Sequence, residues 1–173
     1  MSRAHRLGTP RRNIHGGKNV KYRVNKTAMI AGLAICLTGV AGLVQAADEP
    51  ANVIKYRKSL MTANTSHMGA MGEFAKGTVT FKGGFVEFAT AINAISMQIP
   101  ALFPAGSNTG AETRAKPEIW SKRDDFVAAA KKLETESAKL IVAAKGTDEN
   151  ALKAQITATQ QACGGCHETF RSR

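Results

Sequence analysis

The chain has 173 residues and a formal net charge of +11, with 24 Lys and Arg against 13 Asp and Glu. Residues 1–47 hold eight of the basic residues and none of the acidic ones, which leaves residues 48–173 a net charge of only +3. The strong positive charge is thus confined to the N-terminal segment. The rest of the chain lacks the basic excess that nucleic acid requires, so we expect no nucleic-acid partner.

The N-terminal segment has the three parts of a secretory signal peptide. A basic stretch runs to Lys26, the apolar stretch TAMIAGLAICLTGVAGLV fills residues 27–44, and small residues at 44 and 46 suit a signal peptidase. The apolar stretch is short for a membrane span and has no basic flank after it. We predict a signal peptide over residues 1–46, with an uncleaved membrane anchor as the alternative.

The remaining residues, 47–173, are then predicted to form one domain in the periplasm, without a membrane span after cleavage. Cys36 lies inside the apolar stretch and leaves with the signal peptide. The mature domain therefore keeps two cysteines, both close to its C-terminus, in a compartment where a disulfide is allowed.

Apolar residues spaced by three and four predict two helices in the first half of this domain. The first runs from about Asn52, a plausible N-cap, to Lys76. The second runs from about Thr80 to Ile99 and ends at Pro100, which cannot continue a helix. The apolar residues of the second helix are Phe81, Phe85, Phe88, Ile92, Ile95 and Ile99.

A connection rich in Gly, Pro and small polar residues, 101–116, leads to two further helices. The third opens with Pro117 at its first position and closes at Gly146. The fourth starts near Asp148, and its inward side holds Leu152, Ile156, Thr159, Cys163, Cys166 and Phe170. No stretch of useful length alternates like a strand. The mature domain is therefore predicted to be all-α, an antiparallel up-down-up-down four-helix bundle.

Near its C-terminus the chain reads Cys163-Gly164-Gly165-Cys166-His167. Helical spacing of three residues sets the two thiols on one side of the fourth helix, about 5–6 Å apart at Cβ, within reach of two vinyl groups on one porphyrin edge. The adjacent histidine can supply a nitrogen to iron. Because a Cys-x-x-Cys-His run is the attachment signature of c-type haem, we predict one covalently bound haem c.

Two other interpretations of the motif stay open. A thiol–disulfide oxidoreductase usually carries Cys-x-x-Cys at a helix N-terminus after a strand, where the helix dipole lowers the pKa of a thiol. Here the motif lies at the C-terminal end of a helix. A zinc site needs a fourth, well-spaced ligand, which the motif does not supply. Secretion favours haem, since c-type haem is attached after export.

Three segments ahead of the motif are also distinctive, namely VIKYRKSLM at 53–61, HMGAMG at 67–72 and TRAKPEIW at 113–120. With CGGCHETFR at 163–171 behind them, the chain resembles cytochrome c′ and the wider class II c-type cytochromes over residues 50–173. The resemblance implies one-electron transfer or reversible binding of diatomic gases, and no enzyme activity. It also implies redox partner proteins, NO or CO as ligands, and a homodimer formed through the first two helices.

The resemblance implies roles for four residues around the motif. Cys163 and Cys166 would carry the haem, and His167 would be the axial ligand of the iron. Arg171, four residues after this histidine, matches a basic residue that lies close to it in the family.

Four residues on other helices also match positions around the haem in the family. Arg57 matches an arginine near a haem propionate, and Lys58 and Glu118 match positions that often line the haem edge. Met61 matches the residue that faces the iron from the distal side.

Met61 separates two forms of this predicted site. A thioether on the iron would make the iron six-coordinate and low-spin, with a raised potential, as in a dedicated electron carrier. If Met61 only packs against the porphyrin, the iron stays five-coordinate and admits NO or CO. A methionine that simply fills a gap in the core is a further interpretation. We expect the five-coordinate form and keep the six-coordinate His/Met carrier as the alternative.

Overall fold

The structure is a computed structural model that describes residues 48–173. The predicted signal peptide, residues 1–46, lies outside these residues. The helices in the described part are α1 Pro50–Lys76, α2 Phe85–Gln98, the 3-10 helix η1 Ile99–Leu102, α3 Glu118–Ser121, α4 Arg123–Lys145 and α5 Glu149–Phe170. Over these residues the only β-type pairing is an isolated bridge between Ala115 and Arg171.

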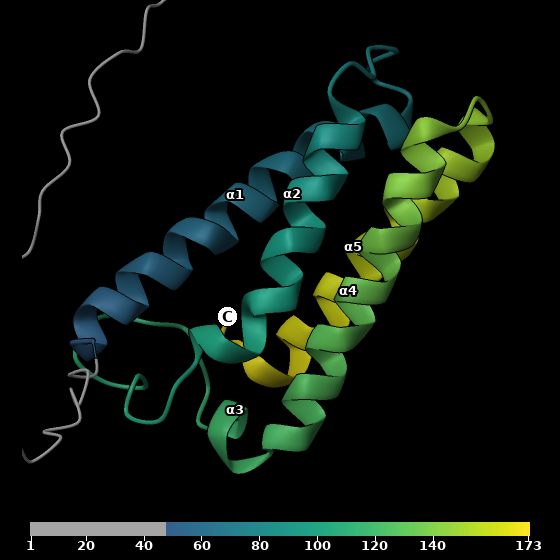
Figure 1. Ribbon diagram of the computed structural model, residues 1–173. Coiled ribbons are helices and arrows are strands. Elements are labelled where there is room, and N and C mark those ends of the chain that lie inside the picture. Colours follow the sequence, from purple (N-terminus) through teal and green to yellow (C-terminus); the bar gives the residue numbers. More distant parts are fainter. Residues whose placement is uncertain (1–47) are drawn as a thin grey trace, which may run out of the picture. The chain divides into compact units, whose positions relative to one another are not determined.

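The four long helices form an antiparallel bundle (Figure 1). Helix α1 packs beside α2 and α5, and α4 packs beside the same two helices, so each long helix has two long neighbours. The chain direction alternates from one long helix to the next in Figure 1. The predicted all-α, up-down-up-down four-helix bundle is therefore confirmed.

Local sequence explains where the helices begin and end. Gly77 ends α1 with φ of 79°, a left-handed conformation that glycine adopts without strain. Asp148 caps α5, because its carboxylate accepts hydrogen bonds from the N–H groups of Asn150 and Ala151 at 2.9 and 3.1 Å. The predicted start of the fourth helix near Asp148 is thus confirmed.

Two predicted helices differ from the observed ones. Helix α2 begins at Phe85 rather than near residue 80, because two glycines precede it and Gly84 has φ of 84°. Phe81, predicted to lie in the buried stripe, is 76% exposed. The third predicted helix is divided, since Lys122 has φ of −118° and ψ of 54° and separates α3 from α4. Ile119 of α3 and Phe126 of α4 belong to the same core cluster.

One stretch of the described residues, Phe85–Leu102, is long and apolar enough by length and composition to cross a membrane. It comprises α2 and η1, and α2 has only 14 residues. Helix α2 packs against α1 and α4, so it serves as a core helix of the bundle.

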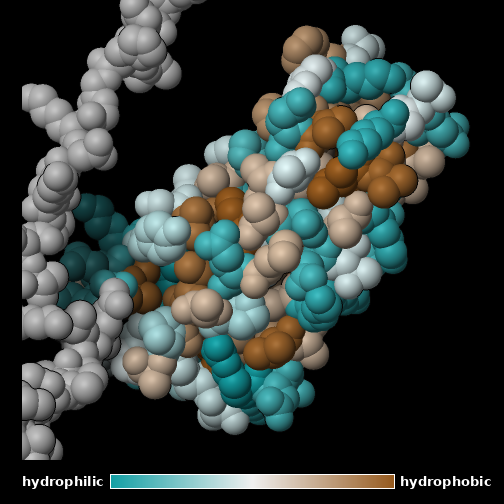
Figure 2. All heavy atoms as spheres, in the orientation of Figure 1, coloured by the Kyte–Doolittle hydropathy of each residue, from teal (hydrophilic) through white to brown (hydrophobic). Residues whose placement is uncertain are grey.

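The core consists of two clusters of buried residues. The first cluster contains Met68, Met71, Phe74, Phe85, Ala89, Ile92, Leu140, Leu152 and Ile156. The second cluster contains Ile99, Ile119, Phe126, Ala130, Leu133, Ala162 and Phe170. Outside these clusters the surface is mixed, and Figure 2 shows hydrophilic and hydrophobic residues interspersed along the face in view.

Candidate haem site

Both cysteines of the motif lie on α5 and pack against the second cluster. Each is half-buried, and they are not joined in a disulfide. Between them, Gly164 and Gly165 are exposed, and a Cβ added at either would meet no atom within 4 Å. The prediction that Cys163 and Cys166 lie on the inward side of their helix is therefore confirmed.

The surroundings of the two thiols keep them protonated. Burial raises the pKa of Cys163, and burial together with the charge of Cys163 raises the pKa of Cys166 to about 11. A thiol–disulfide oxidoreductase needs a reactive thiolate, usually at the positive end of a helix. The motif instead lies in the last third of α5. Its position on the helix thus speaks against this interpretation.

His167 follows the second cysteine in the last turn of α5. Its spacing of four residues from Cys163 predicts that it shares the inward side of the cysteines, but the structure has it exposed. Partial desolvation of the imidazole lowers the pKa of His167, and the positive charge of Arg114 lowers it further. A lowered pKa favours the neutral imidazole, which is the form that binds a metal ion. The side chain is therefore in a suitable protonation state at neutral pH.

The segment after the motif is held in place by the loop that precedes α3. The Ser172 N–H donates to the Arg114 carbonyl at 2.8 Å, and the Lys116 N–H donates to the Phe170 carbonyl at 3.0 Å. The Arg171 N–H donates to the His167 carbonyl at 3.1 Å. These bonds fix the backbone on both sides of the end of α5. They therefore also fix the backbone of Arg171, the basic residue that is predicted to lie close to His167.

Arg57 on α1 is buried, at 2% exposed, although it carries a positive charge. Its guanidinium donates to Ser107 Oγ at 2.8 Å and to Thr113 Oγ1 at 3.0 Å. The guanidinium carbon lies 4.5 Å from the ring centre of Phe103 and 6.0 Å from that of Trp120. Burial lowers the pKa of Arg57. An arginine stays protonated in proteins, so Arg57 carries a full positive charge. The hydroxyl groups and aromatic rings that contact it are all neutral.

No carboxylate of the described residues pairs with this arginine. The ion pairs formed among residues 48–173 are Lys–Glu pairs at the surface. A buried charge is costly unless it has a counter-charge, so the site favours an anionic group beside Arg57. A haem propionate fits this requirement.

An aromatic wall surrounds this position. The rings of Phe103 and Phe126 lie 5.1 Å apart, those of Phe126 and Phe170 5.3 Å apart, and those of Phe103 and Trp120 6.2 Å apart. Trp120 donates its indole N–H to the Pro104 carbonyl at 2.9 Å. Such a wall suits a flat, apolar body such as a porphyrin, and with the thiols and Arg57 it makes the site fit haem c.

Met61 is half-buried and packs against the second cluster, as the two cysteines do. The structure therefore brings the predicted distal residue and the predicted attachment residues to the same end of the core. Lys58 is exposed and Glu118 half-buried, and neither is among the residues that pack against this cluster.

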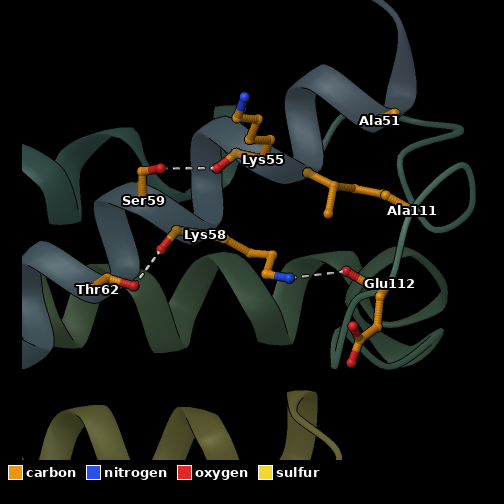
Figure 3. Close-up of a pocket in the computed structure, with 8 residues that line it drawn as sticks. Ala51, Lys55, Lys58, Ser59, Thr62, Ala111 and Glu112 are labelled. Atoms are coloured by element: carbon orange, nitrogen blue, oxygen red, sulfur yellow. Dashed lines mark hydrogen bonds between the residues drawn. The ribbon is translucent and has the colours of Figure 1, made fainter.

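Lys58 instead points across a surface groove of about 480 Å³, drawn in Figure 3. Its ammonium donates to the Glu112 carbonyl at 3.4 Å. The groove is lined by Ala51, Ile54, Lys55, Lys58, Ser59, Thr62, Ala111 and Glu112. It contains no residue of the motif and none of the second cluster.

A site for a metal ion bound by protein alone does not form in the described part of the chain. Over residues 48–173, no group of three or more His, Cys, Asp or Glu side chains is arranged to hold a metal ion. His67, the other histidine of the mature chain, stacks on Phe88 with ring centres 4.9 Å apart. The donor set therefore fits a metal whose remaining ligands come from a porphyrin better than it fits zinc.

Sequence reasoning missed several residues of this site. Ser107 and Thr113, which hold Arg57, lie in the segment 101–116 that looks like a plain connection. Arg114 lies in the same segment, and its effect on His167 depends on the docked C-terminus. Asn64 on α1 is buried with an unpaired carbonyl oxygen. Its position one turn after Met61 was the one signal available.

Comparison with known proteins agrees with this arrangement. Residues 52–171 match the family model described as Cytochrome C′. A cytochrome c′ from Pararhodospirillum photometricum is 37% identical over 122 residues, which is 70% of this chain and 98% of that protein. The crystal structure of cytochrome c′ from Rubrivivax gelatinosus is 32% identical and matches with a TM-score of 0.68 over 72% of this chain and 98% of its own.

A further solved structure is a nitric oxide complex of a mutant of cytochrome c prime from Alcaligenes xylosoxidans. It is 28% identical and matches with a TM-score of 0.65 over 72% of this chain and 98% of its own. The family model covers well over half of the chain, and its match runs from the first turn of α1 to the residue after α5. The chain therefore belongs to the cytochrome c′ family, whose members carry a covalently attached haem c with its iron.

Proposed function

We propose that the mature chain acts in the periplasm in one-electron transfer and binds NO or CO on an open side of its haem iron. One observation carries the proposal. Cys163 and Cys166 on α5 and Met61 on α1 pack against the same core cluster, with the buried charge of Arg57 on the same helix as Met61. A haem attached to the thiols would therefore meet α1 on its other side.

Each residue of the site then has a defined task. Cys163 and Cys166 would hold the haem through thioether bonds, and His167 would supply a nitrogen to its iron. Arg57 neutralises a propionate, and Arg171 lies close to the axial histidine. The bound haem supplies an iron that changes between its ferric and ferrous states and takes up a small ligand.

Lys58 and Glu118 are proposed to line the haem edge. Lys58 projects from α1 toward the Glu112 carbonyl, and Glu118 begins α3, two residues before Trp120. Both have solvent access, so they suit an edge position better than a place beside the iron.

The five-coordinate form is favoured over the six-coordinate one. Met61 is half-buried and packs against the second cluster, and a mutant of the cytochrome c prime from Alcaligenes xylosoxidans has been solved as a nitric oxide complex. The alternative is a low-spin cytochrome with Met61 on the iron, which acts only as an electron carrier. Binding of CO separates the two, because a methionine on the iron blocks the sixth position.

The periplasmic location rests on the signal peptide predicted over residues 1–46 and on attachment of haem after export. Within that compartment the chain is proposed to act as a haem carrier or gas-binding protein rather than as a classical enzyme, with redox proteins as its partners. A thiol–disulfide oxidoreductase remains the remote alternative for the motif.

A homodimer through α1 and α2 is part of the proposal. Tyr56 on α1 is 57% exposed and Met97 on α2 is 61% exposed, so both helices present apolar surface that a second copy of the chain could cover. Sedimentation of the wild type and of Tyr56→Lys would test it. The wild type is expected to sediment as a dimer and the variant more weakly associated, whereas a monomeric wild type would contradict it.

Haem attachment is the experiment that tests the proposed function first. The wild type is expected to keep its haem on a denaturing gel, and the double variant Cys163→Ser/Cys166→Ser to lose it. Thr169→Ala, an exposed change just beyond the motif, serves as the control and should keep the haem. A colourless wild type that reduces a disulfide substrate would instead support the oxidoreductase.

A further inference from the structure

A buried amide on α1 has no task in the site as described so far. Asn64 is 7% exposed, and its Oδ1 is the buried side-chain nitrogen or oxygen of residues 48–173 that lacks any hydrogen-bond partner. By comparison, half-buried Asn93 donates its Nδ2 to the Glu134 carbonyl at 2.9 Å and to Ser137 Oγ at 3.0 Å. Buried polar atoms are nearly always paired, because an unpaired one destabilises the fold. The exception calls for a partner that the protein chain does not supply.

The position of Asn64 indicates where that partner lies. Arg57, Met61, Asn64 and Met68 follow one another at steps of four, three and four, so they share the inner face of α1. Met61 packs with the motif cysteines against the second cluster, whereas Met68 belongs to the first cluster. Asn64 lies between them, about 4.5 Å along the helix axis from Met61. The Asn64 amide therefore lies at the level along α1 where contact with the second cluster gives way to contact with the first.

We propose that Asn64 is the hydrogen-bonding residue of the distal side, where its carboxamide contacts the small molecule at the sixth position of the haem iron. The inference rests on the proposed function, since it needs an open sixth position. This contact makes Asn64 a specificity-determining residue. It raises the affinity for ligands that form a good hydrogen bond relative to the affinity for ligands that form a poor one.

The chemistry of a carboxamide suits this task. The unpaired Oδ1 accepts a hydrogen bond from a bound water. NO has no hydrogen to donate, so it pairs instead with Nδ2, after the carboxamide turns about its Cβ–Cγ bond. Bound CO is the weaker acceptor of the two diatomic gases. Asn64 thus discriminates between NO and CO without touching the iron, while Met61 limits the space available to either.

The variant Asn64→Leu tests this in the full-length holoprotein, because it keeps the volume and removes both polar atoms. We expect the affinity of the ferrous protein for NO to fall about five- to tenfold, the effect of one lost hydrogen bond, with little change for CO. The N–O stretching frequency, read by resonance Raman spectroscopy, should shift in the same variant. Met68→Leu, an apolar change one turn away, is the matched control and should alter neither.

A second measurement compares the unfolding of the ferrous holoproteins without added gas. Removing an unpaired buried acceptor should raise the urea midpoint of the holoprotein in Asn64→Leu. A lowered midpoint would mean that Asn64 has a partner within the protein, which would overturn the proposal.

The ligand measurements separate this inference from the function on which it rests. If wild type and Asn64→Leu bind NO and CO in the same ratio and share one N–O frequency, Asn64 has no contact with the ligand and only this inference fails. If the wild type binds neither gas, the open sixth position fails first, and the inference fails with it.

Discussion

Arg57 is a buried positive charge whose hydrogen-bond acceptors are two neutral hydroxyl groups. If it neutralises a haem propionate, Arg57→Gln should lower the reduction potential, because loss of a nearby positive charge favours the ferric iron. Two charges about 10 Å apart at an effective dielectric constant near 20 give an effect on the order of tens of millivolts. Redox titration monitored by visible absorption measures it.

Lys58→Gln provides the control for this charge effect. Lys58 is the next residue along α1 but is exposed, so water screens its charge and the potential should change much less. Equal shifts for the two variants, or none for Arg57→Gln, would show that the buried guanidinium does not act on the haem.

Met61 is the second residue whose replacement distinguishes the forms of the site. Because Met61 is expected to pack rather than to ligate, Met61→Leu should leave the ferrous spectrum and its response to CO essentially unchanged. The measurement is a pair of reduced spectra with and without CO. Loss of sharp low-spin bands in the variant would show that the thioether is an iron ligand.

At the scale of helices, Gln155 and Glu136 join α5 to α4. The Gln155 amide donates to the Glu136 carboxylate at 2.8 Å, and Lys139 pairs with the same carboxylate at 2.8 Å. The hydrogen bonds from Lys139 and Gln155 lower the pKa of Glu136 in the folded state. This stabilisation is present above the ordinary pKa of a glutamate, about 4.3, and is lost as the pH falls through the lower folded value.

Glu136→Gln should therefore be less sensitive to acid than the wild type. At pH 7 the variant has the lower urea midpoint, and the gap should narrow as the pH falls below the ordinary pKa of a glutamate. Unfolding followed by circular dichroism across this range measures it. A gap that stays constant with pH would show that the carboxylate contributes no proton-linked stability.

The sequence predicts helices better than it predicts their ends and loops. Apolar spacing located every long helix, because burial on a bundle repeats every three to four residues. The extension of the second helix to Phe81 was wrong, since spacing cannot register that Gly84 needs a positive φ. The break at Lys122 was also missed, because it follows from how α3 and α4 dock and not from a Pro or Gly.

The residues of the candidate site also differ in how well the sequence predicts them, depending on whether they lie on a helix or in a loop. The inward position of the motif cysteines on α5 could be predicted from helical spacing, whereas the roles of Arg57 and Met61 on α1 came from the resemblance to the family and remain predictions. Ser107 and Thr113 could not be predicted, since they reach Arg57 from residues about 50 positions away through an irregular loop. Contacts of this kind depend on the tertiary fold alone.

At the scale of the whole molecule, the two core clusters have different tasks. The first contributes to stability alone, whereas the second also packs against the motif cysteines and Met61. Ile92 is fully buried in the first cluster, away from the residues that pack against the motif. Ile92→Ala should therefore cost about 2–5 kcal/mol of unfolding free energy and leave the haem spectrum unchanged. Urea unfolding and visible spectra of the same preparations measure both effects.

Ile92→Val is the matched control, with an expected cost of about 0.5–1.5 kcal/mol. A spectrum altered by either variant at a temperature where the protein is folded would contradict the separation of the two clusters.

The visible absorption spectrum of the purified mature protein, ferric and dithionite-reduced, before and after CO, tests the proposed site most directly. Five-coordinate iron bound by His167 predicts a Soret band and a broad high-spin ferrous band that CO shifts. A sharp α/β pair that CO leaves in place would mean that Met61 occupies the iron, and the absence of any Soret band would contradict a haem protein altogether.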